Sequence, residues 1–197
     1  MLRRPLVLAL SVALAAVLAG GALAATVKVR VEGRTTTIFG PAQPTLRADN
    51  ALQALDVAST AGEFHYVLTM SSVGNYVSQI GKYPAAGTSG WAFKVNGVSP
   101  PVGADQVALK NGDVVLWYWA TFGPAGGPPT LELRRLPGNC YVVESVNDAG
   151  QRSRAATATI TSDGKRFRAR QGRACIGRHK GLVRAVAPGA VRSNAVA

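Results

Sequence analysis

The side chains of this chain that could do chemistry are mainly aromatic and basic. All three tryptophans, Trp91, Trp117 and Trp119, fall in one segment of the 197-residue sequence. Aromatic rings present flat apolar faces that stack on other rings, sugars and peptides, and they also build protein cores. This segment is therefore the first place to look for a binding surface.

Strand alternation predicts which rings share a face. Residues 91–96 and 114–120 have the composition of strands, so Trp117 and Trp119 lie on one face and Tyr118 on the other. One face must form core, and the other would be an exposed platform for a flat ligand; the alternative is that all rings pack internally. The predicted ligand-binding set is Trp91, Phe93, Trp117, Trp119, Tyr76 and Tyr83.

A second group of side chains is cationic. Arginines alternate with apolar residues at 166–170, which places the cations on one face of a strand. Such a stripe attracts anionic cell-envelope polymers or lipid headgroups, or it is a solvated face that protects a sheet edge. An exported protein would not meet nucleic acid. The predicted polyanion-binding set is Arg166, Arg168, Arg170, Arg173, Arg178 and Lys180.

Groups typical of catalysis are sparse. The chain has two histidines, His65 and His179, and neither a Gly-x-Ser-x-Gly nor a His-Glu-x-x-His motif. Asp105 and Asp113 flank one predicted strand, but Asp113 follows an Asn-Gly pair and is expected to cap that turn. We therefore expect a protein that is not an enzyme, with no catalytic residue and no metal site.

The first 24 residues predict export. Arg3 and Arg4 precede an apolar run, and Ala22-Leu23-Ala24 is a small-x-small cleavage signal. A membrane anchor is the alternative, but the run is shorter than the ~20 residues of a spanning helix. We expect a secreted product, extracellular or periplasmic, that starts near Ala25 and has no transmembrane segment.

Charge and cysteines divide the remaining chain. Residues 25–123 carry 7 basic and 6 acidic side chains, whereas residues 124–197 carry 13 and 4. In an exported protein the two cysteines, Cys140 and Cys175, predict one disulfide rather than a metal site or a reactive thiol. Residues 124–129, between the weakly charged first half and the basic second half, are rich in Gly and Pro, and we assign them as a linker.

Hydrophobic patterns give each half a fold class. Residues 25–123 predict one helix, from an Asp49 N-cap to Gly62, on a mostly antiparallel sheet, an α+β unit of β-grasp type. Residues 130–197 predict short strands separated by turns, a small all-β sandwich. The expected strands are 26–32, 35–39, 64–70, 75–80, 91–96, 107–110, 114–120, 131–135, 140–146, 156–161, 166–170, 174–176 and 182–187.

The motifs of the first half resemble a known family. Tyr-Val-x-x-Ile at 76–80, Gly-Trp-x-x-x-Val-Asn-Gly at 90–97 and Asn-Gly-Asp-x-x-x-Trp at 111–117 follow in this order. Residues 26–122 thus look like DUF4430, which is similar to the C-terminal β-domain of transcobalamin and intrinsic factor. That resemblance implies a non-catalytic domain, which in the vitamin carriers closes over cobalamin held by a helical barrel. This chain has no such barrel, so no cofactor is expected.

The second half resembles, more distantly, the Ig-like or carboxypeptidase-regulatory β-sandwiches of bacterial secreted proteins. Residues 181–194 resemble the final strand of such domains. Together the patterns predict a secreted binding or surface-interaction protein that holds a small planar or sugar-like ligand on its aromatic patch. The alternative is an envelope structural or adhesive module that acts through the basic sandwich and has no small-molecule site.

Overall fold

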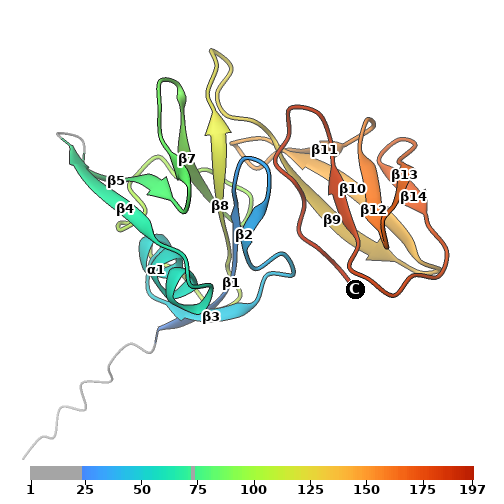
Figure 1. Cartoon of the computed structure of the whole chain (residues 1–197), viewed down its shortest axis with the longest axis horizontal. Coiled ribbons are helices and arrows are strands. Elements are labelled where there is room, and N and C mark those ends of the chain that lie inside the picture. The colour runs from blue at the N-terminus through green and yellow to red at the C-terminus, as the bar shows by residue number, and fades with distance from the viewer. Residues whose placement is uncertain (1–23, 72–73) are drawn as a thin grey trace, which may run out of the picture.

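Two domains lie side by side along the long axis of the molecule (Figure 1). The computed structural model describes residues 24–71 and 74–197, and the predicted signal peptide lies outside them apart from Ala24. The first domain is α+β and the second is all-β, as predicted from the hydrophobic patterns. The strands of the first domain are β1 (Ala25–Glu32), β2 (Thr37–Phe39), β3 (Thr45–Ala48), β4 (Tyr66–Ser71), β5 (Gly74–Ile80), β6 (Tyr83–Pro84), β7 (Ser89–Val95) and β8 (Val114–Thr121).

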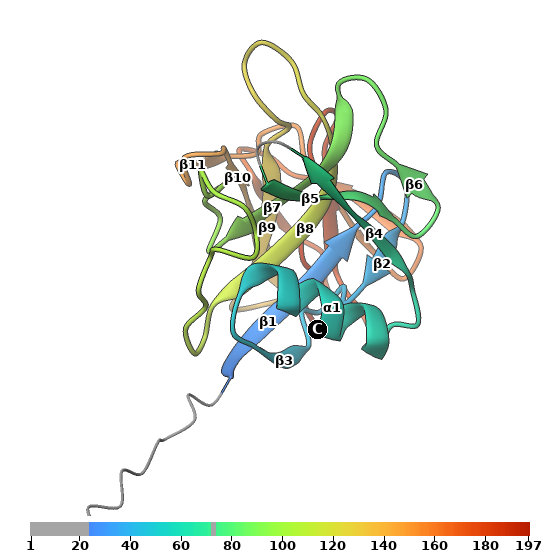
Figure 2. The same ribbon diagram turned by 90° about the vertical axis from the view of Figure 1, so that its left-hand side faces the viewer.

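The main sheet of the first domain has the order β2-β1-β8-β7, and β3 also pairs with β1. Strands β1 and β8 are parallel, while the other pairs of this sheet are antiparallel. A second, three-stranded sheet has the order β4-β5-β6. One helix, α1 (Ala51–Ala61), lies across the main sheet (Figure 2).

The helix begins and ends through local side-chain and backbone contacts. The N-cap is Asn50, whose Oδ1 accepts the N–H of Gln53 at 2.8 Å, so the prediction of Asp49 was one residue too early. The N–H of Asp49 instead donates to the side chain of Gln53, which closes a reciprocal pair of bonds. Gly62 ends the helix as predicted. Ala51, Ala54, Leu55 and Ala58 are buried against Val27, Val29 and Val31 of β1.

The two Asn-Gly pairs form different turns. Asn96 and Gly97 both have positive φ and join Val95 to Val98 in a two-residue turn. The predicted strand at 107–110 is wrong, because Asn111 and Gly112 bond to β1 instead of reversing a hairpin. The Oδ1 of Asn111 accepts the N–H of Thr26, and the N–H of Gly112 donates to the carbonyl of Thr26, both at 2.8 Å. The turn thereby aligns β8 parallel to β1.

The second domain is a sandwich of two sheets. One contains β11, β10, β14 and β9, and the other has the order β13-β12-β15. Their facing side chains, including Leu133, Tyr141, Val143, Ile160 and Val183, form a separate core. The strands are β9 (Thr130–Leu136), β10 (Cys140–Val146), β11 (Arg152–Arg154), β12 (Thr159–Ser162), β13 (Lys165–Arg168), β14 (Arg173–Cys175) and β15 (Arg184–Val186).

The predicted disulfide between Cys140 and Cys175 is confirmed. These residues face one another on the neighbouring strands β10 and β14. The bond closes a loop with a sequence separation of 35 and joins β10 to β14 within the sheet that also contains β9 and β11.

A buried ion cluster joins the two domains. Arg30 and Glu32 alternate with the valines of β1 and so lie on the face of the strand opposite α1, where the second domain covers both and leaves Glu32 with no exposed surface. The carboxylate of Glu32 lies 3.1 Å from Arg30, 2.5 Å from Arg184 and 2.9 Å from Arg192. Burial lowers the pKa of Arg30 to about 10, although the adjacent Glu32 acts against that shift.

Apolar and amino contacts complete this interface. Leu116, Tyr118 and Ala120 of β8 pack with Val191 of the second domain. The buried ammonium of Lys94 donates to the carbonyls of Val146 and Asn147 at 3.1 and 2.9 Å. Burial raises the pKa of Tyr118 to about 12. Both faces of the main sheet are therefore covered, one by α1 and one by the second domain.

Replacing Glu32 with Gln should lower the free energy of unfolding by about 3–5 kcal/mol, because it leaves buried guanidinium groups without their carboxylate. Urea denaturation of the mature chain measures the change. Glu132→Gln is the matched control, because Glu132 pairs with Arg152 at a partly exposed site and should cost about 0–1 kcal/mol. Equal losses in the two variants would contradict a dominant role for the cluster.

Replacing both cysteines with serine should destabilise the second domain by about 3–4 kcal/mol, because the unfolded chain regains the entropy of its 35-residue loop. Urea denaturation of the double variant, compared with the oxidised parent, measures this loss. An unchanged midpoint would show that the sheet pairing alone holds β10 and β14 together.

Candidate functional site

The aromatic side chains of the main sheet separate by face, as alternation predicted. Trp117 lies on the face covered by α1, and Tyr118 lies on the face covered by the second domain. Trp117 is 2% exposed, and its indole N–H donates to the carbonyl of Ala51 at 3.1 Å. It belongs to the core and fixes the start of the helix against the sheet.

Four of the other predicted aromatic residues belong to two groups of neighbouring rings. Phe93 stacks on Trp117 with ring centroids 5.0 Å apart. Tyr83, Trp91 and Trp119 form a second group with centroid separations of 5.7–6.4 Å. The indole N–H of Trp91 donates to the carbonyl of Tyr83 at 2.9 Å, which ties this group to β6.

A small apolar pocket lies between the β4–β5 hairpin and the main sheet. Its volume is about 120 Å³. Trp91, Phe93 and Trp117 line it from the sheet, and Leu68 and Tyr76 line it from the hairpin. The two hairpin residues are 41% and 49% exposed. Gly103, Ala104 and Asp105, from the loop after β7, close the remaining side.

Two predicted aromatic residues do not line this pocket. Tyr83 bonds through its hydroxyl to Thr35 at 2.9 Å. Trp119 lines a separate hollow of about 310 Å³ at the domain junction, beside Pro128 and Arg192. The structure thus brings together Tyr76, Trp91, Phe93 and Trp117 of the predicted set. Leu68 was missed, because an apolar strand residue carries no local signal of a pocket.

The segment that builds the pocket matches a known domain family. Residues 47–121 match DUF4430, a domain of unknown function. This match confirms the resemblance to DUF4430 that the three motifs indicated. The matched segment runs from β3 to the end of β8, and β1, which completes the main sheet, lies before it.

One solved structure adds a distant likeness. It is a crystal structure from Ruminococcus gnavus ATCC 29149, described as that of a candidate metal-binding protein. The two chains are 14% identical, and the alignment covers 50% of this chain and 99% of the other with a TM-score of 0.39. No curated protein matches the chain.

The polar groups considered for catalysis have structural contacts. Asp113 accepts the N–H of Lys110 at 2.7 Å and the side-chain amide of Asn96 at 2.8 Å, so it caps its turn. His65 bonds to Gln79, and His179 lies 2.6 Å from the Tyr141 hydroxyl. Within residues 24–71 and 74–197, no group of three His, Cys, Asp or Glu side chains could hold a metal ion. No helix in this part is long and apolar enough to cross a membrane.

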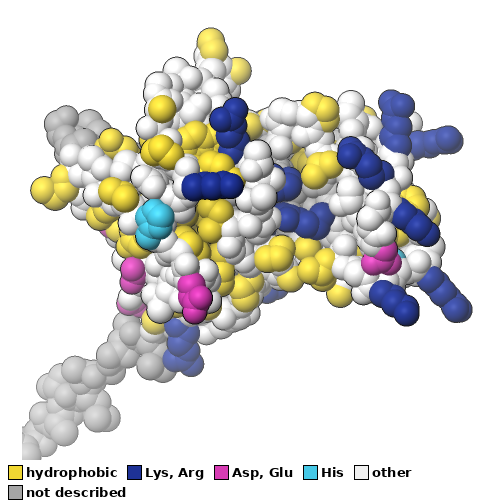
Figure 3. All heavy atoms as spheres, viewed as in Figure 1, with side chains coloured by type: hydrophobic (Ala, Val, Ile, Leu, Met, Phe, Trp, Pro, Cys, Tyr) yellow, Lys and Arg dark blue, Asp and Glu magenta, His cyan; other side chains and the backbone are white. Residues whose placement is uncertain are grey.

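The predicted basic stripe is divided in the structure. In the view of Figure 3, most basic side chains lie over the second domain, whereas apolar side chains extend from the β4–β5 hairpin across the first domain to the junction. Arg168, Arg170 and Arg173 line one open hollow of about 480 Å³ with Phe167. Arg166, Arg178 and Lys180 do not line it. The backbone N–H of Lys180 instead donates to Asp163, which joins its loop to the turn after β12.

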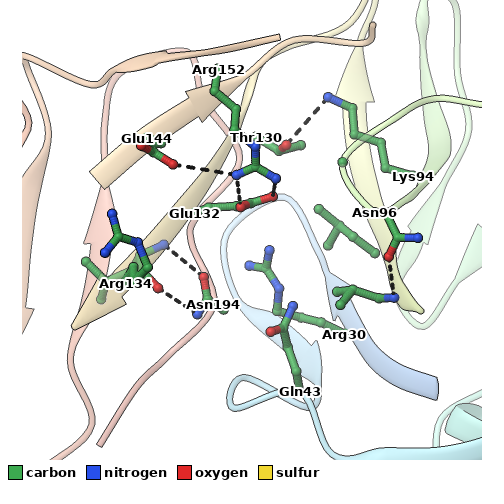
Figure 4. Close-up of a pocket in the computed structure, with 14 residues that line it drawn as sticks. Arg30, Gln43, Lys94, Asn96, Thr130, Glu132, Arg134, Glu144, Arg152 and Asn194 are labelled. Atoms are coloured by element: carbon green, nitrogen blue, oxygen red, sulfur yellow. Dashed lines mark hydrogen bonds and ion pairs between the residues drawn. The ribbon is translucent and has the colours of Figure 1, made fainter. Parts of the chain in front are cut away.

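Another cavity lies where the domains meet (Figure 4). It has a volume of about 360 Å³ and is lined by cations from both domains, including Arg30, Lys94 and Arg134. Arg152 pairs there with the carboxylates of Glu132 and Glu144. Two of the four acidic side chains of the second domain are thereby paired with Arg152.

The pocket wall and its rim should respond differently to truncation. Phe93→Ala should lower the free energy of unfolding by about 3 kcal/mol, because it removes the ring that stacks on Trp117. Tyr76→Ala should cost less than about 1 kcal/mol, because that ring is half exposed. Thermal and urea denaturation measure both; a larger loss for Tyr76→Ala would show that the hairpin holds the domain together.

Proposed function

We propose that this protein is an exported, non-catalytic binding protein whose DUF4430 segment holds one flat ring of a ligand in the aromatic pocket. The observation that carries this proposal is a hollow with aromatic walls and a half-exposed apolar rim. Apolar pockets with a few polar groups are the usual form of small-ligand sites. A half-exposed Leu68 and Tyr76 would lose contact with water when a ligand covers them.

The size of the pocket limits what can enter. A cavity of about 150 Å³ lined by apolar side chains holds one benzene ring, and this pocket has about 120 Å³. Because this volume is slightly smaller, one sugar or aromatic ring would enter only in part, as an anchor, and the rest of the ligand would lie over the hairpin. Asp105 at the rim supplies an acceptor for a hydroxyl or amide group of the ligand.

Export supports the choice of ligands to test. The charged start, apolar run and small-x-small site at residues 1–24 favour secretion to the medium or the periplasm. There the available flat ligands include glycans, peptides and vitamins. The resemblance to the β-domain of cobalamin carriers is the reason for including a corrinoid among the probes, although the residues that the structure describes form no helical barrel to hold one.

The mature chain should bind at least one of three probes: cyanocobalamin, a phenyl glucoside or a short tryptophan-containing peptide. The expected result in NMR spectra is a shift of the indole N–H signals of Trp91 and Trp117, which line the pocket, larger than that of Trp119, which does not. Tyr76→Ala should then weaken binding about three- to tenfold through the loss of ring contact.

Leu182→Ala is the matched control. Leu182 is 47% exposed, close to the exposure of Tyr76, but it belongs to the second domain. It should leave the affinity unchanged. The proposal fails if none of the three probes shifts an indole signal, or if Leu182→Ala weakens binding as much as Tyr76→Ala.

A further inference from the structure

The pairing of strands in the second domain places arginines from distant parts of the sequence on one face. Val142 of β10 pairs with Arg134 of β9 on one side and with Arg173 of β14 on the other. Tyr141 and Val143 point into the core of the sandwich, so these three residues lie on the opposite, outer face. Two strand spacings separate the two arginines, about 10 Å at the backbone.

The outer face is hollowed between these arginines. Val142 is only 1% exposed although it faces away from the core. It lies at a hollow of about 320 Å³ whose rim includes Arg134, Arg154, Arg170 and Arg173. Long arginine side chains cover apolar surface with their stems while their charged ends stay in water. The four guanidinium groups thus surround one concave surface.

This charge is not neutralised by the rest of the molecule. In the part of the chain that the structure describes, the one carboxylate contact of the four arginines joins Arg154 to Glu144, at 4.0 Å. The side chains of Arg134, Arg170 and Arg173 make no hydrogen bond to a described residue. In contrast, Arg152 on the same sheet is held by both Glu132 and Glu144. Like charges gathered without counter-ions favour an anionic ligand.

The hollow continues at both ends. Arg134 also lines the cavity of about 360 Å³ at the domain junction. At the other end, Arg170 and Arg173 also line the open hollow of about 480 Å³ that contains Arg168. Shared arginines therefore connect three concave surfaces in a row. A single small anion would occupy only one of them, whereas an extended chain could occupy all three.

We propose that this arginine track, defined as Arg134, Arg154, Arg168, Arg170 and Arg173, binds a linear polymer whose phosphate or sulfate groups repeat along its chain. The guanidinium fork matches the oxygens of such groups through paired N–H donors. The site is separate from the aromatic pocket, which lies in the other domain, and it does not depend on the function proposed for that pocket.

The test uses the full mature chain and two probes, inorganic polyphosphate and heparin, which separate phosphate from sulfate chemistry. Binding is followed by calorimetry at several salt concentrations. The track variant R134Q/R173Q should bind its preferred polymer at least about tenfold more weakly, because it loses two charge-assisted contacts. The slope of the logarithm of the binding constant against the logarithm of the salt concentration should become less negative by about one to two.

The matched control is R166Q/R178Q, which removes the same charge from exposed positions of the same domain outside the three hollows. It should lose less than about threefold through the weaker overall field. Equal losses in the two double variants would overturn the track and leave only net charge. Orthophosphate, measured as the monomeric control for polyphosphate, should bind more weakly, and equal affinity of the two would overturn the extended site.

A conservative double variant distinguishes weaker binding from unfolding of the protein. R134K/R173K keeps both charges but loses the forked donors, so it should bind with an affinity between those of the parent and R134Q/R173Q. Thermal denaturation should give all three double variants the midpoint of the parent, because these side chains are exposed. Lysine and glutamine variants of equal affinity would contradict binding through charge.

Discussion

The carboxylate of Glu32 is the interaction on which the two-domain arrangement depends. It is fully buried and has three arginines around it, Arg30 from its own strand and Arg184 and Arg192 from the second domain. A buried carboxylate is costly unless cations and hydrogen bonds replace the lost water. The surplus of positive charge is offset by main-chain carbonyls: Arg30 donates to Arg192, Arg184 to Ser193 and Arg192 to Gly33. The domains therefore cannot separate without exposing a charge network that was assembled from both.

The fold class was predictable because it rests on local patterns, but this interface was not. Alternation in β1 correctly separates Val27, Val29 and Val31 from the polar side chains between them. It cannot distinguish a polar face in water from one buried against complementary charge, because both give the same sequence pattern. Arg184 and Arg192 lie more than 150 residues away and give no local sign of their partner.

The same limit explains which site residues could be predicted. The aromatic strands were evident from composition, and alternation correctly separated Trp117 from Tyr118. The pocket itself depends on how the β4–β5 hairpin folds onto the sheet, which brings Leu68 to Phe93 and is not encoded in either strand alone. For the basic surface, the sequence pattern showed only the alternating arginines at 166–170, which follow one another along one strand. The register of β9, β10 and β14 instead gathers cations across strands, and so it adds Arg134 and removes Arg166.

The buried junction between the two domains fixes the aromatic pocket relative to the arginine track. The aromatic pocket lies at the β4–β5 hairpin, whereas the arginine track begins at the junction and runs over the second domain. The hairpin and the second domain lie at opposite ends of the molecule (Figure 1). Lys94 and Glu32 hold the junction by buried contacts on two strands of the main sheet, so the distance between the surfaces is set by the fold rather than by the Gly/Pro linker. A flexible tether would let each domain sample many orientations, and its length would set the effective concentration of one site near the other. In this protein the fixed junction would instead hold the pocket in one orientation relative to a polymer bound on the arginine track. A ligand in the pocket would touch no residue of the track, so the two binding events would be linked only by the fixed distance and orientation between the two surfaces.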